Sequence, residues 1–294
     1  MRVPVTERNA ILTQADGSSW ALSTERFTEA PTRWLLIDIV GWYGGSGVRS
    51  TVTDRYRHGD FPSRGWREGR TISLRGAAIS KTSMTRDDVE RELSGILWDG
   101  QEGTLAVQEA DDRVLWTTVR LDGAPSIEKL DERAIEFSIP LRSAEPFVYG
   151  PWREGTLTLP GAGVGLEYPL FSKTLSESKG PVLTFGAAID TEVTMWNNGN
   201  ATSYPQIEVV GDLPGGFAVT IGSRRVTYPW PTFPDMPVLV DMSGSLSVSG
   251  QDQSHRLVER NWTGIEQGGV ETPRLDPLQG GTGWAVVRHR DTYI

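Results

Sequence analysis

The chain has 294 residues, which at roughly 100–200 residues per domain predicts about two domains. Its 29 Lys and Arg against 38 Asp and Glu give a formal charge of −9, which argues against a dedicated nucleic-acid-binding surface. The absence of cysteine excludes disulfides, thiolate nucleophiles and zinc–thiolate sites. No run approaches the ~18 apolar residues of a membrane span, and the N-terminus has no apolar signal core, so we expect neither a membrane span nor a cleaved export signal.

The N-terminal third predicts strands around an exposed arginine-rich segment. Short strands are expected around Ala10–Thr13 and Trp20–Leu22. Trp34–Val40 is almost continuously apolar, which predicts a strand buried on both faces. Val48–Arg67 is rich in arginine and poor in aliphatic residues, so we expect an exposed, hairpin-like excursion. Gly69–Gly76 alternates apolar and polar residues between two glycines, as a strand does.

One helix is predicted, over Met84–Trp98. Thr85 and Asp88 form a capping-box-like start, and Asp87 joins Asp88 in the expected first turn, where the helix dipole favours carboxylates. Residues at helical spacing form an apolar stripe expected to face a sheet: Val89, Leu93, Ile96 and Leu97.

Three strands are expected after the helix, at Gly103–Gln108, Arg113–Leu121 and Arg133–Leu141. Pro146 ends this pattern because proline cannot continue a strand ladder. Glycine and proline then recur without long apolar runs. We therefore place a domain boundary near residue 150, which divides the chain into residues 1–150 and 151–294.

The second half predicts an all-β domain. Its clearest feature is a hairpin in which Asn197-Asn198-Gly199-Asn200 makes the turn and Gln206–Val210 alternates polar and apolar residues. Further strands follow at a spacing of about 8–12 residues, which is typical of a β-sandwich. The expected strands are Val182–Phe185, Thr191–Met195, Phe217–Ile221, Arg224–Tyr228, Pro237–Asp241, Leu246–Ser249, His255–Val258 and Trp284–His289.

Five features occur in an order that resembles one protein family. They are Arg57-His58-Gly59, then Gly69-Arg70-x-Ile72-x-Leu74-x-Gly76, the helix, Leu141-Arg142-Ser143-Ala144-Glu145-Pro146-Phe147, and the hairpin with Pro205-x-Ile207-x-Val209 and Gly211. The sequence resembles the distal tail proteins of long-tailed, siphovirus-type bacteriophages. The resemblance covers most of the chain by pattern and order, and it does not depend on any single motif.

The resemblance implies a mainly β structural protein of the virion. Residues 1–150 would form a tail-tube-like β-sandwich or split barrel with one flanking helix, and residues 151–294 a galectin-like β-sandwich. Six copies would close into a ring at the distal end of the tail. The ring would join the major tail tube protein to the tail-tip and baseplate proteins, next to the tape measure protein. DNA would pass through its lumen without specific binding.

A ring requires two different complementary patches on each subunit. The arginine-rich segment Arg49–Arg67 could meet the acidic stretches Asp87–Glu90 and Glu109–Asp112 of a neighbour. The alternative is that all of these are solvated surface charges, since exposed ion pairs contribute only about 0–1 kcal/mol.

No constellation for catalysis or metal binding is evident, and we expect no enzymatic activity, cofactor or metal. The three histidines, His58, His255 and His289, are far apart in the sequence. Gly44–Gly47 lacks the lysine of a phosphate-binding loop, and no Gly-x-Ser-x-Gly elbow occurs. Glu136 and Glu208 lie on the polar faces of alternating strands, so surface salt bridging is expected of them. A wall or capsule hydrolase is thereby disfavoured.

An aromatic loop leaves an alternative function open. Tyr228–Pro234 spaces three aromatic rings with prolines, and Trp262 follows in the same domain. Exposed aromatic rings can stack on sugars, so Tyr228, Trp230 and Trp262 are candidate residues of a module that binds host cell-surface glycan. The interpretation that we favour is that these rings pack in the core or in a subunit contact, because Trp is highly buried on average.

Overall fold

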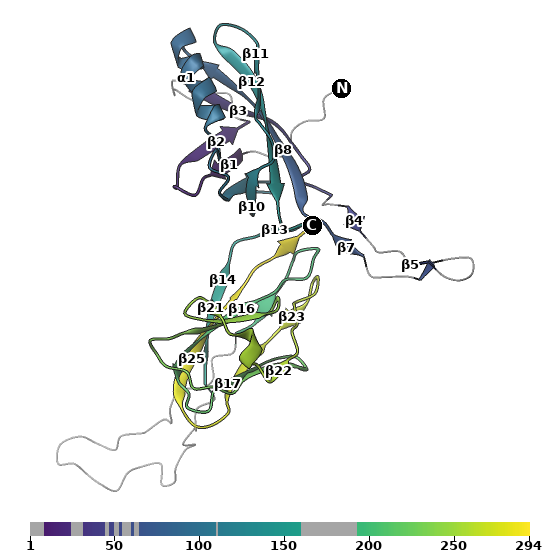
Figure 1. Cartoon of the computed structure of the whole chain (residues 1–294), viewed down its shortest axis with the longest axis vertical. Coiled ribbons are helices and arrows are strands. Elements are labelled where there is room, and N and C mark those ends of the chain that lie inside the picture. The colour runs from purple at the N-terminus through teal and green to yellow at the C-terminus, as the bar shows by residue number, and fades with distance from the viewer. Residues whose placement is uncertain are drawn as a thin grey trace, which may run out of the picture. The chain divides into compact units, whose positions relative to one another are not determined.

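The computed structural model of the chain describes residues 9–24, 32–44, 47–49, 53–54, 60–61, 65–109, 111–159 and 193–294. The chain forms two compact units (Figure 1). Unit 1 comprises Met1–Pro151 and Thr292–Ile294, and unit 2 comprises Trp152–Asp291. The last three residues therefore belong to the N-terminal unit.

Unit 1 is built on a closed seven-stranded barrel. In barrel order its strands are β12 (Ala134–Ser143), β8 (Arg70–Ser80), β3 (Thr32–Val40), β2 (Ser19–Ser23), β1 (Asn9–Thr13), β9 (Gly103–Gln108) and β10 (Val114–Leu121). β10 closes the barrel on β12 through two pairs, Arg120 with Arg142 and Leu121 with Leu141. β11 (Ser126–Lys129) adds to β12, β13 (Val148–Tyr149) adds to β10, and β26 (Thr292–Tyr293) adds to β13.

The barrel interior is filled by alternate residues of its strands. Every second residue of β8, from Arg70 to Ser80, is buried. At Gly76 the space is so tight that a Cβ atom would lie 2.5 Å from the ring of Phe137 and 2.7 Å from Leu22. A glycine at this position therefore lets the aromatic ring fill the barrel.

One helix, α1 (Ser83–Ser94), flanks the barrel (Figure 1), as the sequence predicts. Val89 and Leu93 are buried in the core of unit 1, and the remaining stripe residues, Ile96 and Leu97, are buried in the turn that follows. The predicted start, Met84, is one residue late, and the predicted end at Trp98 and the placement of Asp87 and Asp88 in the first turn are wrong. The helix starts at Ser83, so Asp87 lies beyond its first turn, and it stops at Ser94.

The expectation that β3 is buried on both faces is also wrong. Leu36 and Ile39 are buried, whereas Val40 is half exposed. The reason is that β3 belongs to a barrel with a single interior, so its outward side chains meet no second packed layer of the kind that covers a parallel sheet.

The arginine-rich excursion is a hairpin, as predicted. Its base is formed by β4 (Val48–Arg49) and β7 (Trp66–Arg67), and its outer part by β5 (Thr53–Asp54) and β6 (Asp60–Phe61). His58 lies outside the described residues.

Unit 2 contains two main antiparallel sheets. The six-stranded sheet has the order β14 (Arg153–Thr158), β25 (Thr282–His289), β16 (Gln206–Asp212), β19 (Val238–Asp241), β20 (Ser245–Val248) and β21 (Gln251–Asp252). The four-stranded sheet has the order β22 (Glu259–Arg260), β18 (Arg224–Tyr228), β17 (Phe217–Ile221) and β24 (Pro273–Pro277). β15 (Met195–Trp196) pairs with β23 (Val270–Glu271).

The two sheets share one core. Val209 and Val287 from the six-stranded sheet are buried in the same cluster as Phe217 and Val219 from the four-stranded sheet. The mainly β fold class is thus confirmed in both units. The predicted strand at His255–Val258 is wrong, since a 3-10 turn, η1 (Ser254–Arg256), lies there, and Val182–Phe185 lies outside the described residues.

Candidate functional site

Polar side chains from β8 and β12 meet on the outward face of the barrel. Arg75 of β8 donates a hydrogen bond to Glu136 of β12 at 3.1 Å, and the hydroxyls of Ser73 and Ser138 lie 2.9 Å apart across the same two strands. These cross-strand contacts leave polar groups on the outward face of the two strands.

The base of the hairpin carries exposed apolar side chains. Trp66 is 65% exposed, and a Cβ atom on the adjacent Gly65 would lie 2.4 Å from Val48 of the facing strand. Val40 and Tyr43, at the end of β3 and in the turn after it, are also more than half exposed. Exposed apolar side chains of this size are common at interaction sites, so the hairpin base is a candidate for one.

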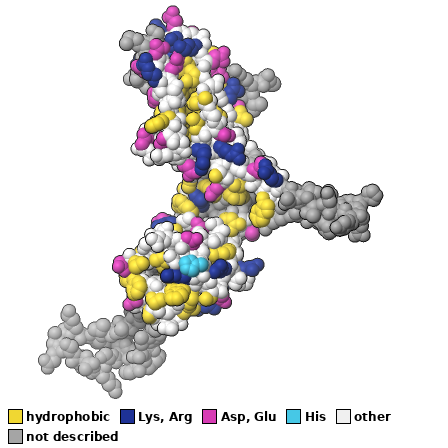
Figure 2. Space-filling view, in the orientation of Figure 1, with side chains coloured by type: hydrophobic (Ala, Val, Ile, Leu, Met, Phe, Trp, Pro, Cys, Tyr) yellow, Lys and Arg dark blue, Asp and Glu magenta, His cyan; other side chains and the backbone are white. Residues whose placement is uncertain are grey.

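The acidic stretches proposed for a ring contact are compensated within the chain. Their ion pairs are Asp87–Arg86 (3.1 Å), Asp88–Arg91 (2.8 Å), Glu90–Lys129 (3.1 Å), Glu109–Arg113 (3.4 Å) and Asp111–Arg113 (2.5 Å). In the arginine-rich hairpin, Arg49 binds Glu68 at 2.5 Å. Figure 2 shows acidic and basic side chains intermixed over the viewed surface of unit 1. These observations favour the alternative of solvated surface charge for these stretches.

Arg70, which the sequence analysis places in the motif Gly69–Gly76 without giving it a role, is a buried cation. Its guanidinium donates to the carbonyl oxygen of Pro146 at 2.7 and 3.1 Å and also to that of Trp42. Burial, and then the charge of Arg67, lower the pKa of Arg70. Arg70 thus ties the start of β8 to the segment after β3 and to the proline that ends β12.

Unit 2 contains a buried polar cluster where its chain begins and ends. Arg153 donates two hydrogen bonds to the carboxylate of Asp291, and the backbone N–H of Asn198 donates a third at 2.7 Å. The Arg153 guanidinium also lies 4.9 Å from the ring centre of Trp196. Although burial acts to raise the pKa of Asp291, these hydrogen bonds and the Arg153 charge lower it.

His289 is packed into the same cluster. It is buried, its ring lies edge-on to Trp196 with centres 5.0 Å apart, and neither ring nitrogen has a hydrogen-bond partner. Burial and the charge of Arg153 lower its pKa, although Asp291 opposes the shift. His289 is therefore a core residue and not a surface ligand.

The three candidate sugar-binding residues differ in their exposure to solvent. Tyr228 is only 2% exposed and packs on Phe217 with ring centres 5.7 Å apart, so its ring cannot contact a ligand at the surface. Trp262 is partly buried against the core of unit 2. Trp230 is 49% exposed, with the guanidinium of Arg256 lying 5.3 Å from its ring centre. The three rings therefore do not form one exposed platform.

Among the residues that the structure describes, no three His, Cys, Asp or Glu side chains gather into a possible metal site. None of the helices described is long and apolar enough to cross a membrane.

A solved phage structure shares this architecture. The crystal structure of the Dit protein of phage SPP1, described as a paradigm of the hub adsorption apparatus in phages that infect Gram-positive bacteria, matches with a TM-score of 0.56. The match covers 89% of this chain and 94% of SPP1 Dit at 10% sequence identity. This chain has the Dit fold.

The Dit fold extends through both units, because unit 1 alone is too short to supply 89% of the chain. Two structures of the phage P2 baseplate in its activated conformation, with Ca and with Sr, also match, at 11% and 9% identity. They cover 97% and 95% of this chain and 98% and 97% of their own chains, but TM-scores of 0.47 and 0.42 are too low to support an inference. No family model and no curated protein matches the sequence.

Within the Dit fold, sequence patterns did not reveal the Arg153–Asp291 cluster or the Arg70 anchor. Arg153 and Asp291 are 138 residues apart in the sequence, and Arg70 binds carbonyl groups, which every residue carries. The sequence did carry one indication of the Arg70 anchor. Arg70 is a charged residue at a position that the alternation of β8 places inside the barrel.

Proposed function

We propose that this protein is the distal tail hub of a siphovirus-type phage, located in the virion at the distal end of the tail. The observation that carries the proposal is the Dit fold over both units, with SPP1 Dit covered over 94% of its length. The role is structural, and no catalytic residue is assigned.

Six copies would form the hub ring. Unit 1 presents two dissimilar surfaces, the polar outward face of β8 and β12 and the apolar base of the hairpin around Trp66. A heterologous contact between unlike surfaces is what a closed ring requires. We expect each contact to bury roughly 2,000 Å² or more, as obligate interfaces do. The net charge of −9 would let DNA pass through the lumen without specific binding.

The ring would connect the tail tube to the tail tip. Its proposed partners are the major tail tube protein and the tape measure protein on one side and the tail-tip or baseplate proteins on the other. Unit 2, a sandwich of six-stranded and four-stranded sheets, would serve as a galectin-like docking domain outside the ring.

Two measurements test the hub proposal. Light scattering at two protein concentrations, followed by electron micrographs, should show a ring of six copies with a central hole. Because a hub can remain monomeric until a tail assembles, gold-labelled antibody against unit 2 should also be applied to virions that contain the protein. Label at the distal tip is expected, and label confined to the head or absent from the virion would refute the proposal.

A second candidate function is adhesion to host glycan through the exposed ring of Trp230. Stacking of a sugar on this indole predicts that Trp230→Ala abolishes binding to purified host wall glycan in isothermal titration. The matched control is Trp98→Ala, which removes an exposed indole from unit 1. Equal binding by wild type and Trp230→Ala would reject this function and leave the hub proposal untouched.

A further inference from the structure

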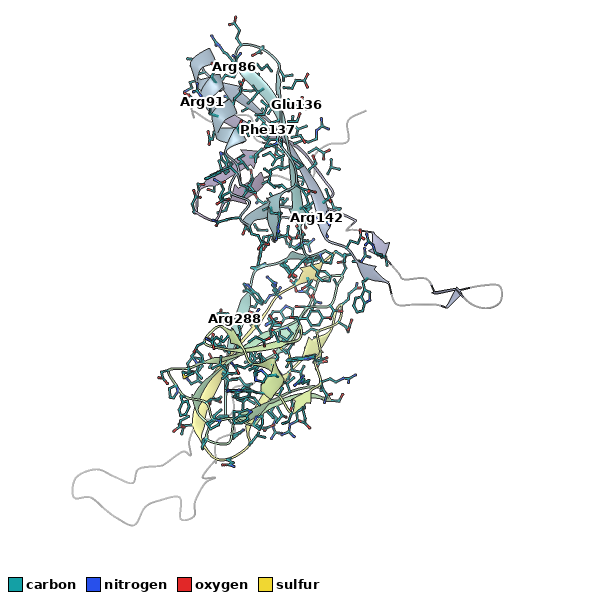
Figure 3. All side chains as sticks on the ribbon, viewed as in Figure 1. Arg86, Arg91, Glu136, Phe137, Arg142 and Arg288 are labelled. Carbon is teal, nitrogen blue, oxygen red and sulfur yellow. The ribbon has the colours of Figure 1, made fainter. Side chains whose placement is uncertain are left out.

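The outward side chains divide the barrel of unit 1 into a charged half and an uncharged half. The charged half consists of β3, β8 and β12, on which Asp38, Arg75 and Glu136 face outward. Figure 3 marks Glu136 and Arg142 on β12. The uncharged half consists of β2, β1, β9 and β10. Figure 1 shows β1, β2 and β10 on one side of unit 1 and β8 and β12 on the other.

Three rows of outward side chains cross the uncharged half, with one residue from each strand in each row. In the order β2, β1, β9 and β10, the rows are Ser23, Asn9, Gln108 and Val114; Ala21, Ile11, Ala106 and Trp116; and Ser19, Thr13, Thr104 and Thr118. None of these side chains carries a charge, although 23% of the residues of the chain are charged. The alternate residues of the same strands, such as Leu12 and Leu105, fill the barrel. The lack of charge is therefore a property of the outer surface and not a consequence of burial.

Charges return at the two ends of β10, and there they are paired. Beyond the last residue of β10 that pairs with β9, Arg120 binds Glu102 at 2.7 Å. Just before β10 begins, Arg113 binds Asp111 at 2.5 Å and Glu109 at 3.4 Å. The arginines that border the uncharged half along β10 are thus held by carboxylates of the same chain.

The uncharged half offers hydroxyl, amide and apolar groups instead. Asn9 donates a hydrogen bond to the side-chain oxygen of Gln108 at 2.5 Å, so these two amides bind each other. In the middle row, Ile11 is 41% exposed, and the ring of Trp116 lies 5.6 Å from that of Tyr149 on β13. Such groups can contact a passing molecule, but they have no charge with which to hold it.

Duplex DNA interacts differently with charged and uncharged surfaces. It carries one negative charge per about 1.7 Å of its axis, and each Lys or Arg that binds a phosphate releases counterions and strengthens binding. Carboxylates lining a narrow passage would instead repel the duplex. The charged half, which presents Arg75 and Glu136 on neighbouring strands, would do both. The uncharged half does neither, which is the property that a passage for DNA requires.

We propose that the uncharged half lines the channel of the hub ring, so that duplex DNA slides along β2, β1, β9 and β10. The inference rests on the proposed hub assembly and adds to it the orientation of unit 1. The charged half then remains available for contacts between neighbouring copies. A neighbouring copy is the other candidate occupant of the uncharged half, because interface cores are also depleted of charge. Chemical labelling distinguishes the two occupants.

Single cysteines report where this face lies, because the chain has none of its own. Thr118→Cys places a thiol at an exposed position of the face, and the matched control Ser245→Cys places one at an exposed position of β20 in unit 2. In assembled rings, a biotin maleimide should react with both. Streptavidin, which is wider than duplex DNA, should then bind the Ser245→Cys label but not the Thr118→Cys label. Virions that carry each variant replace purified rings if the isolated chain remains monomeric.

Added charge tests the same face through its effect on DNA. Thr118→Arg rings should bind fluorescent duplex DNA about tenfold or more tightly than wild-type rings at about 50 mM salt, and the gain should shrink at about 500 mM salt. Ser245→Arg adds the same charge to unit 2 and should give a much smaller gain. Circular dichroism and melting temperature verify that every variant is folded.

Three outcomes would overturn the inference while the hub proposal stands. Streptavidin bound to Thr118→Cys would show that the face lies outside the channel. A Thr118→Cys thiol that reacts with the maleimide in the free chain but not in the assembly would place the face in a contact between copies. Equal affinities of Thr118→Arg and Ser245→Arg rings for DNA would exclude a DNA path along the face. Virions whose tail tip lacks the protein would instead reject the hub proposal, and this inference with it.

Discussion

Arg153 and Asp291, the second and the last residues of unit 2, are joined by a two-armed ion pair. The pair ties the first strand of the unit to the second residue after its last strand, and the backbone N–H of Asn198 donates to the same carboxylate. The beginning and the end of unit 2 are thereby held together by side chains as well as by the β14–β25 ladder.

We predict that Asp291→Asn destabilises unit 2 by about 2–4 kcal/mol, because Arg153 would remain largely buried beside Trp196 without its anion. Hydrogen exchange of β14 and β25 peptides in the full chain measures the effect within unit 2. The control Asp276→Asn breaks the pair with Arg274, whose side chain is 70% exposed, and should cost at most about 1 kcal/mol. Equal protection in the two variants would show that the Arg153–Asp291 pair has no special role.

Unit 2 should lose stability in acid. The pKa of His289 is lowered from 6.5 in the folded chain, so the unfolded chain binds its proton first as the pH falls. The resulting loss begins near pH 6.5 and continues down to the folded pKa. Asp291, whose pKa is lowered from 3.8, adds stability above that value that is lost as the pH falls through its folded pKa.

The variant His289→Gln tests the histidine contribution. It should remove the part of the pH dependence of unfolding that begins near pH 6.5 while leaving the part below 3.8. Hydrogen exchange of the full chain at several pH values, read in peptides from unit 2, measures this pH dependence. The control is His255→Gln, which changes an exposed histidine. A wild-type profile that is flat between pH 7 and 5 would contradict the prediction.

The helix stripe is a third test. Leu93 is fully buried in the core of unit 1, so Leu93→Ala should destabilise that unit by roughly 2–5 kcal/mol. Trp98→Ala, a few residues later at a side chain that is 79% exposed, should change stability by no more than about 0.5 kcal/mol. Denaturant unfolding, monitored by hydrogen exchange in peptides from β8, measures the stability of unit 1 in both variants. A small effect of Leu93→Ala would mean that α1 is peripheral.

Two glycines with the same backbone conformation allow the cost of backbone strain to be distinguished from the cost of a steric clash. Gly17 and Gly41 have φ of +86° and +85°, but a Cβ atom on Gly41 would lie 2.2 Å from the carbonyl oxygen of Thr71, whereas none lies within 4 Å at Gly17. Gly17→Ala should cost about 1–2 kcal/mol through the left-handed conformation alone. Gly41→Ala should cost at least about 3 kcal/mol, since the turn after β3 must also move. Equal costs in denaturant unfolding would exclude the collision.

The sequence by itself determined the class of the fold and most of its strands. Alternation in Gly69–Gly76 and Gln206–Val210 and the stripe of Leu93 predicted elements correctly because periodicity is a local property that a strand or a helix imposes on neighbouring residues. Their ends were less certain, as the early stop of α1 at Ser94 shows.

Only the tertiary structure decided which residues meet. It put the last three residues into unit 1, buried Tyr228 while exposing Trp230, and set Arg120 beside Arg142. The physical reason is that burial and pairing depend on partners that the chain brings from far away. A residue's own neighbours in the sequence determine its conformation, but not the side chain that it faces.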